Sequence, residues 1–334
     1  MSFPPGTLLV HKTIGAAFIE AISNSVAIPK PSPHRRFVMQ DGSEFVVSDD
    51  QMIQTTQRCH TQASLLVPGE RLLTVTHDYQ GMLSESAAYI KGFLLGDGTL
   101  TVNGDPLLWL YEPKYCCGER LSASAAEVTS AILEFDAVAD AERPRKRLNG
   151  IGQLTPLVHW ASDYKKQLPS RAFSWNRKTL CEFLAGVFDS DGHSQDGKTA
   201  FGYQLSSIHR QFLLDIQLLL KSMGVRSKVA MAQMAQKKQL PNGVYDCQDL
   251  WRLTVPQSGS IRLAQLVKFT RLKDFSARTV SRIPTDNAGL ISEVHPVDHL
   301  CPSYDVPSSE PILLANQVVI RPDPHPTPPV YYCF

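Results

Sequence analysis

Two aspartates close two similar nine-residue segments, and together they offer ligands for a divalent metal ion. The segments read IKGFLLGDG over Ile90–Gly98 and LAGVFDSDG over Leu184–Gly192, and the aspartates are Asp97 and Asp191. A carboxylate at the carboxyl end of a helix is disfavoured by about 0.3–1 kcal/mol, and two neighbouring carboxylates disfavour each other further. A divalent cation between them would reverse that cost, and oxygen ligands favour Mg²⁺, Mn²⁺ or Ca²⁺ over zinc.

Such a site requires that both segments form helices and that the helices meet. Helix-like sequence precedes each segment, over residues 85–89 and 178–183. Small residues recur four positions apart, on one helix face, which would let the two backbones approach closely: Gly92 with Gly96, and Gly186 with Ser190. We expect each helix to end at a glycine in the left-handed conformation, namely Gly98 and Gly192.

The order of elements after each segment indicates an internal repeat. After Gly192 we predict a strand over 199–207, a helix over 210–223 and strands over 227–231 and 250–255, with a hairpin turn at 241–243 between the last two. After Gly98 we predict a strand over 107–111, a helix-like run over 123–133, and later strands that include Leu154, Val158 and Trp160. A lone helix ending in Asp-Gly is common, but two copies with matched spacing favour a repeat.

Composition limits the compartment and the class of protein. The chain has 334 residues, of which 43% are hydrophobic, enough for two or three domains. No apolar run reaches the roughly 18 residues that span a bilayer, and no secretory signal is evident. The seven cysteines include no Cys-x-x-Cys pair. We therefore expect an intracellular, cytoplasmic protein with reduced thiols, no zinc site and no membrane partner.

The net charge of +1 conceals an uneven distribution. Residues 85–285 carry more basic than acidic residues, whereas the two flanks are acidic. The basic part also carries the repeated segments, which favours neutralisation of nucleic-acid phosphates, although any single cluster could be an ordinary solvated surface. The candidate contacts to DNA are Arg145, Lys146, Arg147, Lys165, Arg210, Arg226 and Lys228.

The two segments resemble the motif of the LAGLIDADG homing endonucleases, in the form with two motifs in one chain. The resemblance implies two four-stranded sheets that form a saddle over DNA, with the motif helices between them. It implies that Asp97 and Asp191 bind Mg²⁺ or Mn²⁺ at the scissile phosphates, with the backbone oxygens of Gly96 and Ser190 as further ligands. It assigns no catalytic role to Asp189, whose counterpart in the first segment is Leu95.

The family also places a lysine near the active site in each half. Residues 166–169, KQLP, resemble the block that precedes the second motif, which makes Lys166 the candidate of the first half. Lys273 is the candidate of the second half. Either lysine would stabilise phosphate charge or position the attacking water, and the alternative for each is an ordinary surface lysine.

The flanks resemble a Hint (intein) domain. The resemblance rests on residues 2–10, 37–51, 66–72, 303–306 and 312–320. Splicing requires a nucleophile, a histidine and a terminal His-Asn, and the matching positions hold Ser2, Gln51, Arg321 and Pro322. Gln51 cannot titrate as a base, so we expect a degenerate scaffold without splicing. Unrelated β-rich flanks are the alternative.

Together these features predict an α+β chain with two αββαββα halves and a split all-β flank. The expected bounds are a Hint-like first half over 1–80, an endonuclease domain over 84–285 with repeats at 84–170 and 177–280, a Hint-like second half over 286–322 and a Pro-rich tail over 323–334. The expected function is site-specific hydrolysis of double-stranded DNA at a long target site, by a monomer. The alternatives are a maturase or regulator that binds nucleic acid without cleaving it, and a chain that still self-processes.

Overall fold

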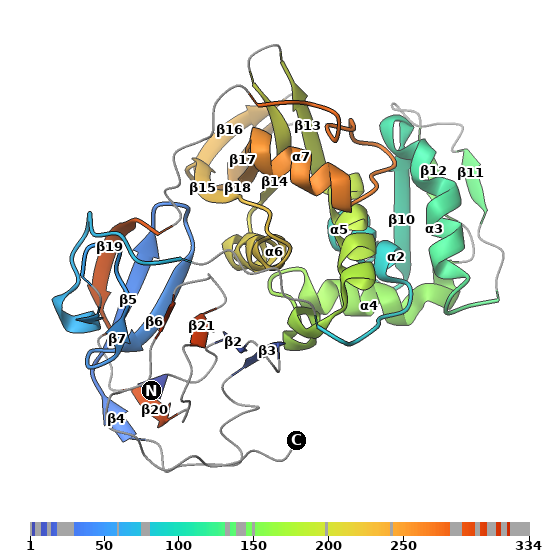
Figure 1. The fold of residues 1–334 in the computed structure, drawn as a ribbon. Coiled ribbons are helices and arrows are strands. Elements are labelled where there is room, and N and C mark those ends of the chain that lie inside the picture. Colours follow the sequence, from blue (N-terminus) through green and yellow to red (C-terminus); the bar gives the residue numbers. More distant parts are fainter. Residues whose placement is uncertain are drawn as a thin grey trace. The chain divides into compact units, whose positions relative to one another are not determined.

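The computed structural model describes residues 2–3, 8–11, 15–18, 30–58, 60–74, 81–130, 134–137, 145–148, 151–197, 200–240, 243–280, 289–297, 301–305, 312–314 and 319–320. The chain divides into two compact units. One unit comprises residues 82–216 and 225–283, and the other comprises residues 1–81, 217–224 and 284–334. The first of these contains both repeated segments and mixes helices with sheets (Figure 1).

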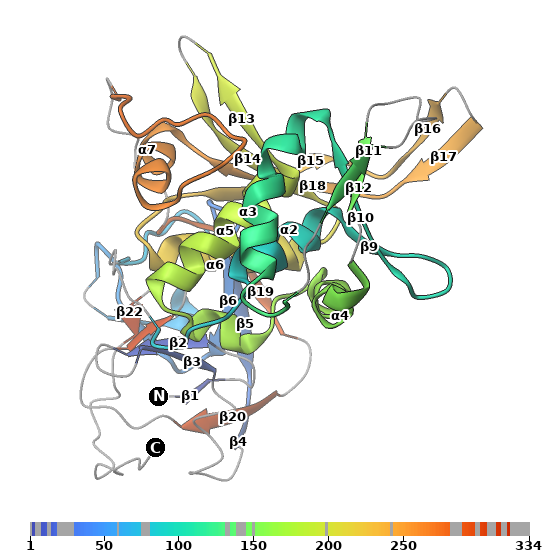
Figure 2. The same cartoon turned by 90° about the vertical axis from the view of Figure 1, so that its right-hand side faces the viewer.

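The two repeated segments end two helices that lie side by side in both views. Helix α2 spans Ala88–Asp97 and helix α5 spans Arg177–Asp191 (Figure 2). Helix α5 begins after Asn176, whose side chain accepts a hydrogen bond from the Thr179 amide at 2.9 Å and thereby caps the first turn. The prediction of two helices ending in aspartate is confirmed.

Small residues let the backbones of α2 and α5 touch, as the spacing predicted. A Cβ atom placed on Gly92 would collide with the carbonyl oxygen of Phe183. A Cβ atom on Gly186 would collide with the carbonyl oxygen of Tyr89 and lie 2.8 Å from the amide nitrogen of Phe93. Because these obstacles are backbone atoms, side-chain rotation cannot relieve them.

The prediction of left-handed glycines at the two helix ends is wrong. Gly98 has φ −70° and ψ 136°, and Gly192 has φ −72° and ψ 159°, so both continue directly into strands. Glycine is required at these two positions because a side chain would not fit, and not because φ is positive. A Cβ atom on Gly98 would lie 2.5 Å from the Leu94 carbonyl oxygen, and one on Gly192 would collide with that of Phe188.

The first four-stranded sheet follows α2. Its strands are β9 (Gly98–Leu100), β10 (Pro106–Tyr111), β11 (Phe135–Ala137) and β12 (Arg145–Leu148), in the order β11-β12-β10-β9. The 3-10 helix η2 (Glu112–Cys117) and helix α3 (Gly118–Ala125) connect its two hairpins. The predicted strand over 107–111 is confirmed. Of the predicted helix-like run over 123–133, residues 123–125 end α3, residues 126–130 are not helical, and residues 131–133 lie outside the described residues.

The region assigned to later strands of the first half is helical instead. Residues Ile151–Leu154 form the 3-10 helix η3, and Thr155–Tyr164 form helix α4, which contains Val158 and Trp160. Leu154, Leu157, Val158 and Ala161 are buried at helical spacing, and Pro156 stands in the first turn, where its missing N–H has no helical partner to lose. The short 3-10 helix η4 (Ser170–Ser174) then leads to α5.

The second four-stranded sheet follows α5. It consists of β13 (Gly192–Asp196), β14 (Phe201–Ser207), β15 (Lys228–Gln233) and β18 (Leu250–Val255), in the order β13-β14-β18-β15. Helix α6 (Arg210–Ser222) lies between β14 and β15 in the chain, and α7 (Gln257–Leu266) follows β18. Strands β16 (Gln236–Leu240) and β17 (Gly243–Cys247) form a further hairpin that extends away from the sheet (Figure 2). The predicted turn thus belongs to this additional hairpin.

Both halves therefore share one order of elements. In each, a motif helix is followed by two strands, a helix, two more strands of the same sheet and a last helix. In each sheet, the first and second strands are adjacent, and the fourth lies between the second and the third. The second half adds only the β16–β17 hairpin.

The other unit is built from short antiparallel strands. Its sheets are β1-β20-β4, β19-β5-β6 and β3-β2-β21-β22-β7-β8. Their bounds are β1 Ser2–Phe3, β2 Leu8–His11, β3 Gly15–Phe18, β4 Lys30–Ser32, β5 His34–Met39, β6 Glu44–Ser48, β7 Met52–Ile53, β8 Thr61–Gln62, β19 Ile291–Pro296, β20 Cys301–Asp305, β21 Ile312–Leu314 and β22 Val319–Ile320. The 3-10 helix η1 (Ala63–Leu65) follows β8. The predicted strand-turn-strand over 37–51 is present as β5 and β6.

The four positions matched to splicing residues are placed only in part. Ser2 lies in β1, paired with Asp305 of β20. Gln51 is 5% exposed, and its side-chain amide donates to the Met52 carbonyl oxygen at 3.2 Å. Arg321 and Pro322 lie outside the described residues.

Candidate metal and nucleic-acid site

The ends of α2 and α5 bring the two motif aspartates together. A Cβ atom on Gly96 would lie 2.7 Å from Cγ and 2.8 Å from Oδ2 of Asp191. Burial raises the pKa of Asp97 above its usual range, and the charge of Asp191 raises it further, while Lys114 and Arg271 oppose both effects. The Asp97 side chain is 15% exposed, whereas Asp191 is exposed.

Lys114 contacts the first aspartate and was not among the predicted site residues. Its Nζ atom lies 2.7 Å from both Oδ1 and Oδ2 of Asp97, and its side chain is 17% exposed. Lys114 lies in η2, the connection between β10 and α3. Arg210 begins α6 three residues after the end of β14, and Lys114 stands three residues after the end of β10. Comparison of the two repeats would therefore have drawn attention to Lys114.

Arg271 fixes the end of the second motif helix. Its Nε atom donates to the Asp189 carbonyl oxygen at 2.7 Å. Its Nη2 atom donates to the carbonyl oxygens of Phe188 at 3.1 Å, Gly192 at 2.5 Å and Ser190 at 3.4 Å. A guanidinium at the negative end of a helix dipole stabilises that end, and here it also contacts the predicted ligand oxygen of Ser190.

Asp189 has a structural environment. It is fully buried and accepts hydrogen bonds from the amides of Thr270 at 2.9 Å and Arg271 at 3.0 Å, and from the Tyr89 hydroxyl at 3.0 Å. These bonds hold the segment that carries Arg271 against the end of α5.

The two lysines predicted for the active site have other neighbours. Lys273 pairs with Asp196 at 2.6 Å, an exposed contact that Asp196 shares with Arg278 at 2.6 Å. Lys166 is exposed and follows α4. The pKa of the His209 imidazole is lowered, mainly by burial and further by the positive charges of Lys166 and Lys165. The contact to a motif aspartate is made by Lys114.

The oxygen atoms at the helix ends fit a hard divalent cation. No group of three or more histidine, cysteine or acidic side chains able to hold a metal occurs among the described residues. The predicted donors are the carboxylates of Asp97 and Asp191 and the backbone oxygens of Gly96 and Ser190. Mg²⁺ accepts such a set, because it is commonly bound by one or two carboxylates and retains waters or phosphate oxygens in its other positions.

The first sheet has an open face that carries aromatic and basic side chains. Trp109 is paired with Arg147 and Tyr111 with Arg145 across β10 and β12, so all four lie on one face. The Arg145 guanidinium lies 4.3 Å from the centre of the Trp109 ring. Leu108 and Leu110, at the alternate positions, are buried on the helix side.

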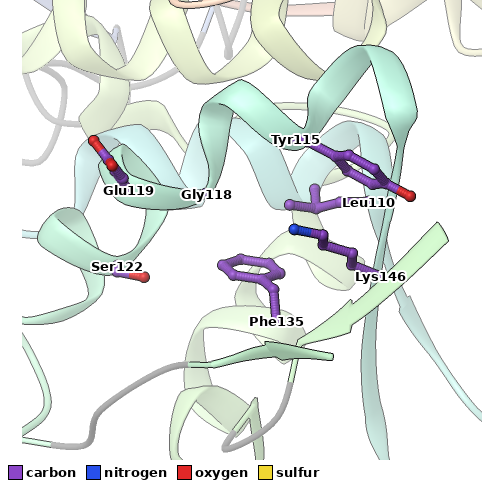
Figure 3. Close-up of a pocket in the computed structure, with 7 residues that line it drawn as sticks. All are labelled: Leu110, Tyr115, Gly118, Glu119, Ser122, Phe135 and Lys146. Atoms are coloured by element: carbon purple, nitrogen blue, oxygen red, sulfur yellow. The ribbon is translucent and has the colours of Figure 1, made fainter. Parts of the chain in front are cut away.

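Lys146 lies on the other face of the same strand. It is paired with Leu110 and its Nζ atom lies 4.8 Å from the centre of the Tyr115 ring. It points into a pocket of about 470 Å³ between the sheet and α3 (Figure 3), which is lined by Leu110, Tyr115, Gly118, Glu119, Ser122, Phe135 and Lys146. This placement separates Lys146 from Arg145 and Arg147.

The second sheet has a polar open face. Register places His193, Gln204, Thr254 and Lys228 in one row of that face, and Ser206 and Arg252 in the next. The alternate residues Leu205, Leu253 and Val229 are buried. Arg252 donates to the Ser206 hydroxyl at 3.4 Å. Hydroxyl, amide and guanidinium groups on one sheet face are suited to contact with base edges and phosphates.

The remaining predicted nucleic-acid contacts are dispersed. Arg210 stacks on Trp251, with its guanidinium carbon 5.1 Å from the ring centre. Arg226 is exposed, two residues before the start of β15. Lys165 is exposed beside Lys166.

Comparison with known proteins finds a family model that matches part of the chain. The family model of the LAGLIDADG-like domain matches residues 178–265, from α5 to α7. The ribonucleoside-diphosphate reductase large subunit of Invertebrate iridescent virus 6 is 28% identical over 273 residues, which are 78% of this chain and 26% of that protein. The ribonucleoside-diphosphate reductase NrdEB subunit alpha of Bacillus subtilis (strain 168) is 25% identical over 219 residues, 60% of this chain and 20% of that protein. The chain thus spans about a quarter or less of these relatives.

Solved structures resemble the chain only distantly. The structure of I-DmoI in complex with DNA and Mn has a TM-score of 0.35 and 13% identity, and the likeness covers 54% of this chain and 94% of that one. Full-length DUF199/WhiA from Thermatoga maritima has a TM-score of 0.35 and 13% identity, covering 57% and 58%. These scores carry no argument, so the similarity rests on the family model: residues 178–265 match the LAGLIDADG-like domain.

Proposed function

We propose that this chain is a double-motif LAGLIDADG endonuclease that hydrolyses double-stranded DNA at a long specific site, acts as a monomer and uses Mg²⁺ or Mn²⁺. The main support is the meeting of Asp97 and Asp191 at the ends of α2 and α5. The match of residues 178–265 to the LAGLIDADG-like family model and the basic or polar open faces of both sheets also support the proposal. We assign the endonuclease to residues 84–285, with repeats at 84–170 and 177–280.

The proposed roles follow from the contacts. Asp97 and Asp191 hold the cation, together with the backbone oxygens of Gly96 and Ser190, and the bound metal supplies Lewis-acid stabilisation of phosphate charge. Arg271 keeps the end of α5 in place through its bonds to carbonyl oxygens. Lys166 and Lys273 remain candidates for contacting the phosphates that flank the site.

The proposed contacts to DNA follow the open faces. Arg145, Arg147, Lys228 and Arg252 lie there and provide phosphate and base contacts. Arg210, Arg226 and Lys165 contribute phosphate contacts at the edges. Lys146 is not included in this set, because it faces the pocket beneath the sheet.

The reductase relatives favour a related proposal about the flanks. The alignment with the viral subunit covers 78% of this chain, well beyond residues 178–265, yet only 26% of that protein. We infer that the aligned stretch is an element inserted in a larger chain, with residues 1–80 and 286–322 as a degenerate Hint-like scaffold and residues 323–334 as a tail. Among the described residues, no helix is long and apolar enough to cross a membrane. We place the protein inside the cell, with its DNA.

The test is Mg²⁺-dependent cleavage of a randomised duplex library by the unaltered chain and by Asp97→Asn and Asp191→Asn. We expect cleavage of one sequence class, and its loss in both variants while duplex binding persists. Asp50→Asn is the matched control, because Asp50 is an exposed carboxylate in the unit that contains residues 1–81. We expect this variant to retain cleavage. Tight, salt-sensitive binding without cleavage by the unaltered chain would instead support a maturase or regulator.

A further inference from the structure

The ammonium of Lys114 occupies the position of a cation on the first motif aspartate. Nζ is 2.7 Å from Oδ1 and 2.7 Å from Oδ2 of Asp97, so it lies between the two oxygens. The side chains are only 17% and 15% exposed, which limits screening of the pair by solvent. Neither Asp97 oxygen is therefore left without a counter-charge.

Two cations oppose the negative charge on Asp97 without a metal ion. Asp97 and Asp191 contribute two negative charges, and the charges of Lys114 and Arg271 act on Asp97 in the opposite sense. Loss of either cation would leave an excess of negative charge at this position. A divalent cation would then bind more tightly, because less positive charge opposes it.

The two cations differ in how firmly they are held. Arg271 donates to four backbone carbonyl oxygens at the end of α5 and is part of that end. Lys114 extends a flexible four-carbon side chain from η2, and its ammonium donates to both oxygens of the Asp97 carboxylate. The cation of the first helix end can therefore move, whereas that of the second is fixed.

We propose that Lys114 and the divalent metal compete for Asp97, so that metal enters the first motif only as the ammonium swings away. This inference rests on the proposed function, because it takes Asp97 as a metal ligand. The released ammonium is then available to a DNA phosphate. Metal loading and contact with DNA are thereby coupled through one side chain.

Calorimetric titration with Mn²⁺ in the absence of DNA tests the competition. We expect Lys114→Met to bind Mn²⁺ more tightly than the unaltered chain, on the order of tenfold. Lys114→Arg retains the charge and should not gain affinity. Lys237→Met breaks an exposed pair with Asp246, in which the two side chains are 78% and 85% exposed, and should leave affinity unchanged.

The outcomes separate this inference from the proposed function. Equal or weaker Mn²⁺ binding by a folded Lys114→Met variant overturns the competition, as does an absence of Mn²⁺ binding by every variant. Circular dichroism and thermal melting establish that the variant is folded. If Asp97→Asn and the unaltered chain bind Mn²⁺ with equal affinity, Asp97 is not a metal ligand. That result would overturn both the ligand assignment and the competition. The cleavage assay above judges the endonuclease function independently.

Discussion

At the residue scale, the two motif aspartates have different surroundings although their sequences match. Asp97 is largely buried and paired with Lys114. Asp191 is exposed, and the cation at its helix end contacts backbone carbonyl oxygens instead of the carboxylate. The two similar motifs therefore place their aspartates in different surroundings. The reason is that the neighbouring cations come from different segments: Lys114 from η2, and Arg271 from residues 270–275.

A buried carboxyl at another residue makes stability depend on pH. Asp215 on α6 is 4% exposed, accepts hydrogen bonds from the Leu168 amide and the Gln211 side chain, both at 2.8 Å, and has its pKa raised by burial to about 6. An unfolded aspartate has a pKa of about 3.9, so between these values only the folded chain keeps the proton. Stability therefore falls as pH rises from about 4 to about 6, by on the order of 3 kcal/mol, and is constant above that range.

The variant Asp215→Asn should lose this part of the pH dependence. Urea unfolding at several pH values from 4 to 7.5 would measure it, with Asp163→Asn, an exposed change on α4, as the control. Parallel stability curves for the unaltered chain and Asp215→Asn would contradict the expected pKa.

At the element scale, the packing of α2 on α5 depends on glycine. Gly186→Ala should destabilise the chain by about 3 kcal/mol, because the new Cβ atom would collide with the Tyr89 carbonyl oxygen and the helices would have to separate. Gly152→Ala in η3 is the matched control, since nothing lies within 4 Å of its Cβ position. Urea denaturation measures the stability of both variants. Equal stability of Gly186→Ala and the unaltered chain would show that the two helices are farther apart than these contacts indicate.

The two faces of β12 provide another test. Arg147→Gln should weaken duplex binding and reduce the slope of log affinity against log salt by about one, because it removes one phosphate contact. Lys146→Gln, at the neighbouring residue on the opposite face, should leave the slope unchanged. Fluorescence anisotropy over a range of salt concentrations compares them, and a reduced slope for Lys146→Gln alone would place DNA on the helix side of the sheet.

At the scale of the whole molecule, the unit that contains residues 1–81 and 284–334 should not process the chain. Gln51 is buried against the Met52 carbonyl oxygen and has no group that titrates near neutral pH. We expect the purified chain to keep its mass of 37.0 kDa during prolonged incubation with thiols or hydroxylamine. Mass spectrometry would detect cleavage, and fragments that disappear in Ser2→Ala would reveal residual self-processing.

The sequence by itself determined the motif helices, their contact through small residues and three of the four strands of the second sheet, β14, β15 and β18. These features depend on local periodicity and on residue size, which can be read along the chain. The later part of the first half was assigned to strands, because the apolar residues Leu154, Val158 and Trp160 alone do not distinguish a short helix from a strand. The sequence also marked the glycines at the helix ends, but glycine is needed there because a Cβ atom would not fit, and not because φ is positive.

Only the tertiary structure decided which cations meet the aspartates. Lys166 and Lys273 were selected by their places in the chain. In the folded chain, Lys114 reaches the end of α2 from η2, and Arg271 reaches the end of α5 from the segment after α7. The faces of the strands likewise required the register, since Lys146 and Arg147 are adjacent in sequence and opposite in space. Long-range ion pairs and strand register are set by packing between distant segments, which no local pattern encodes.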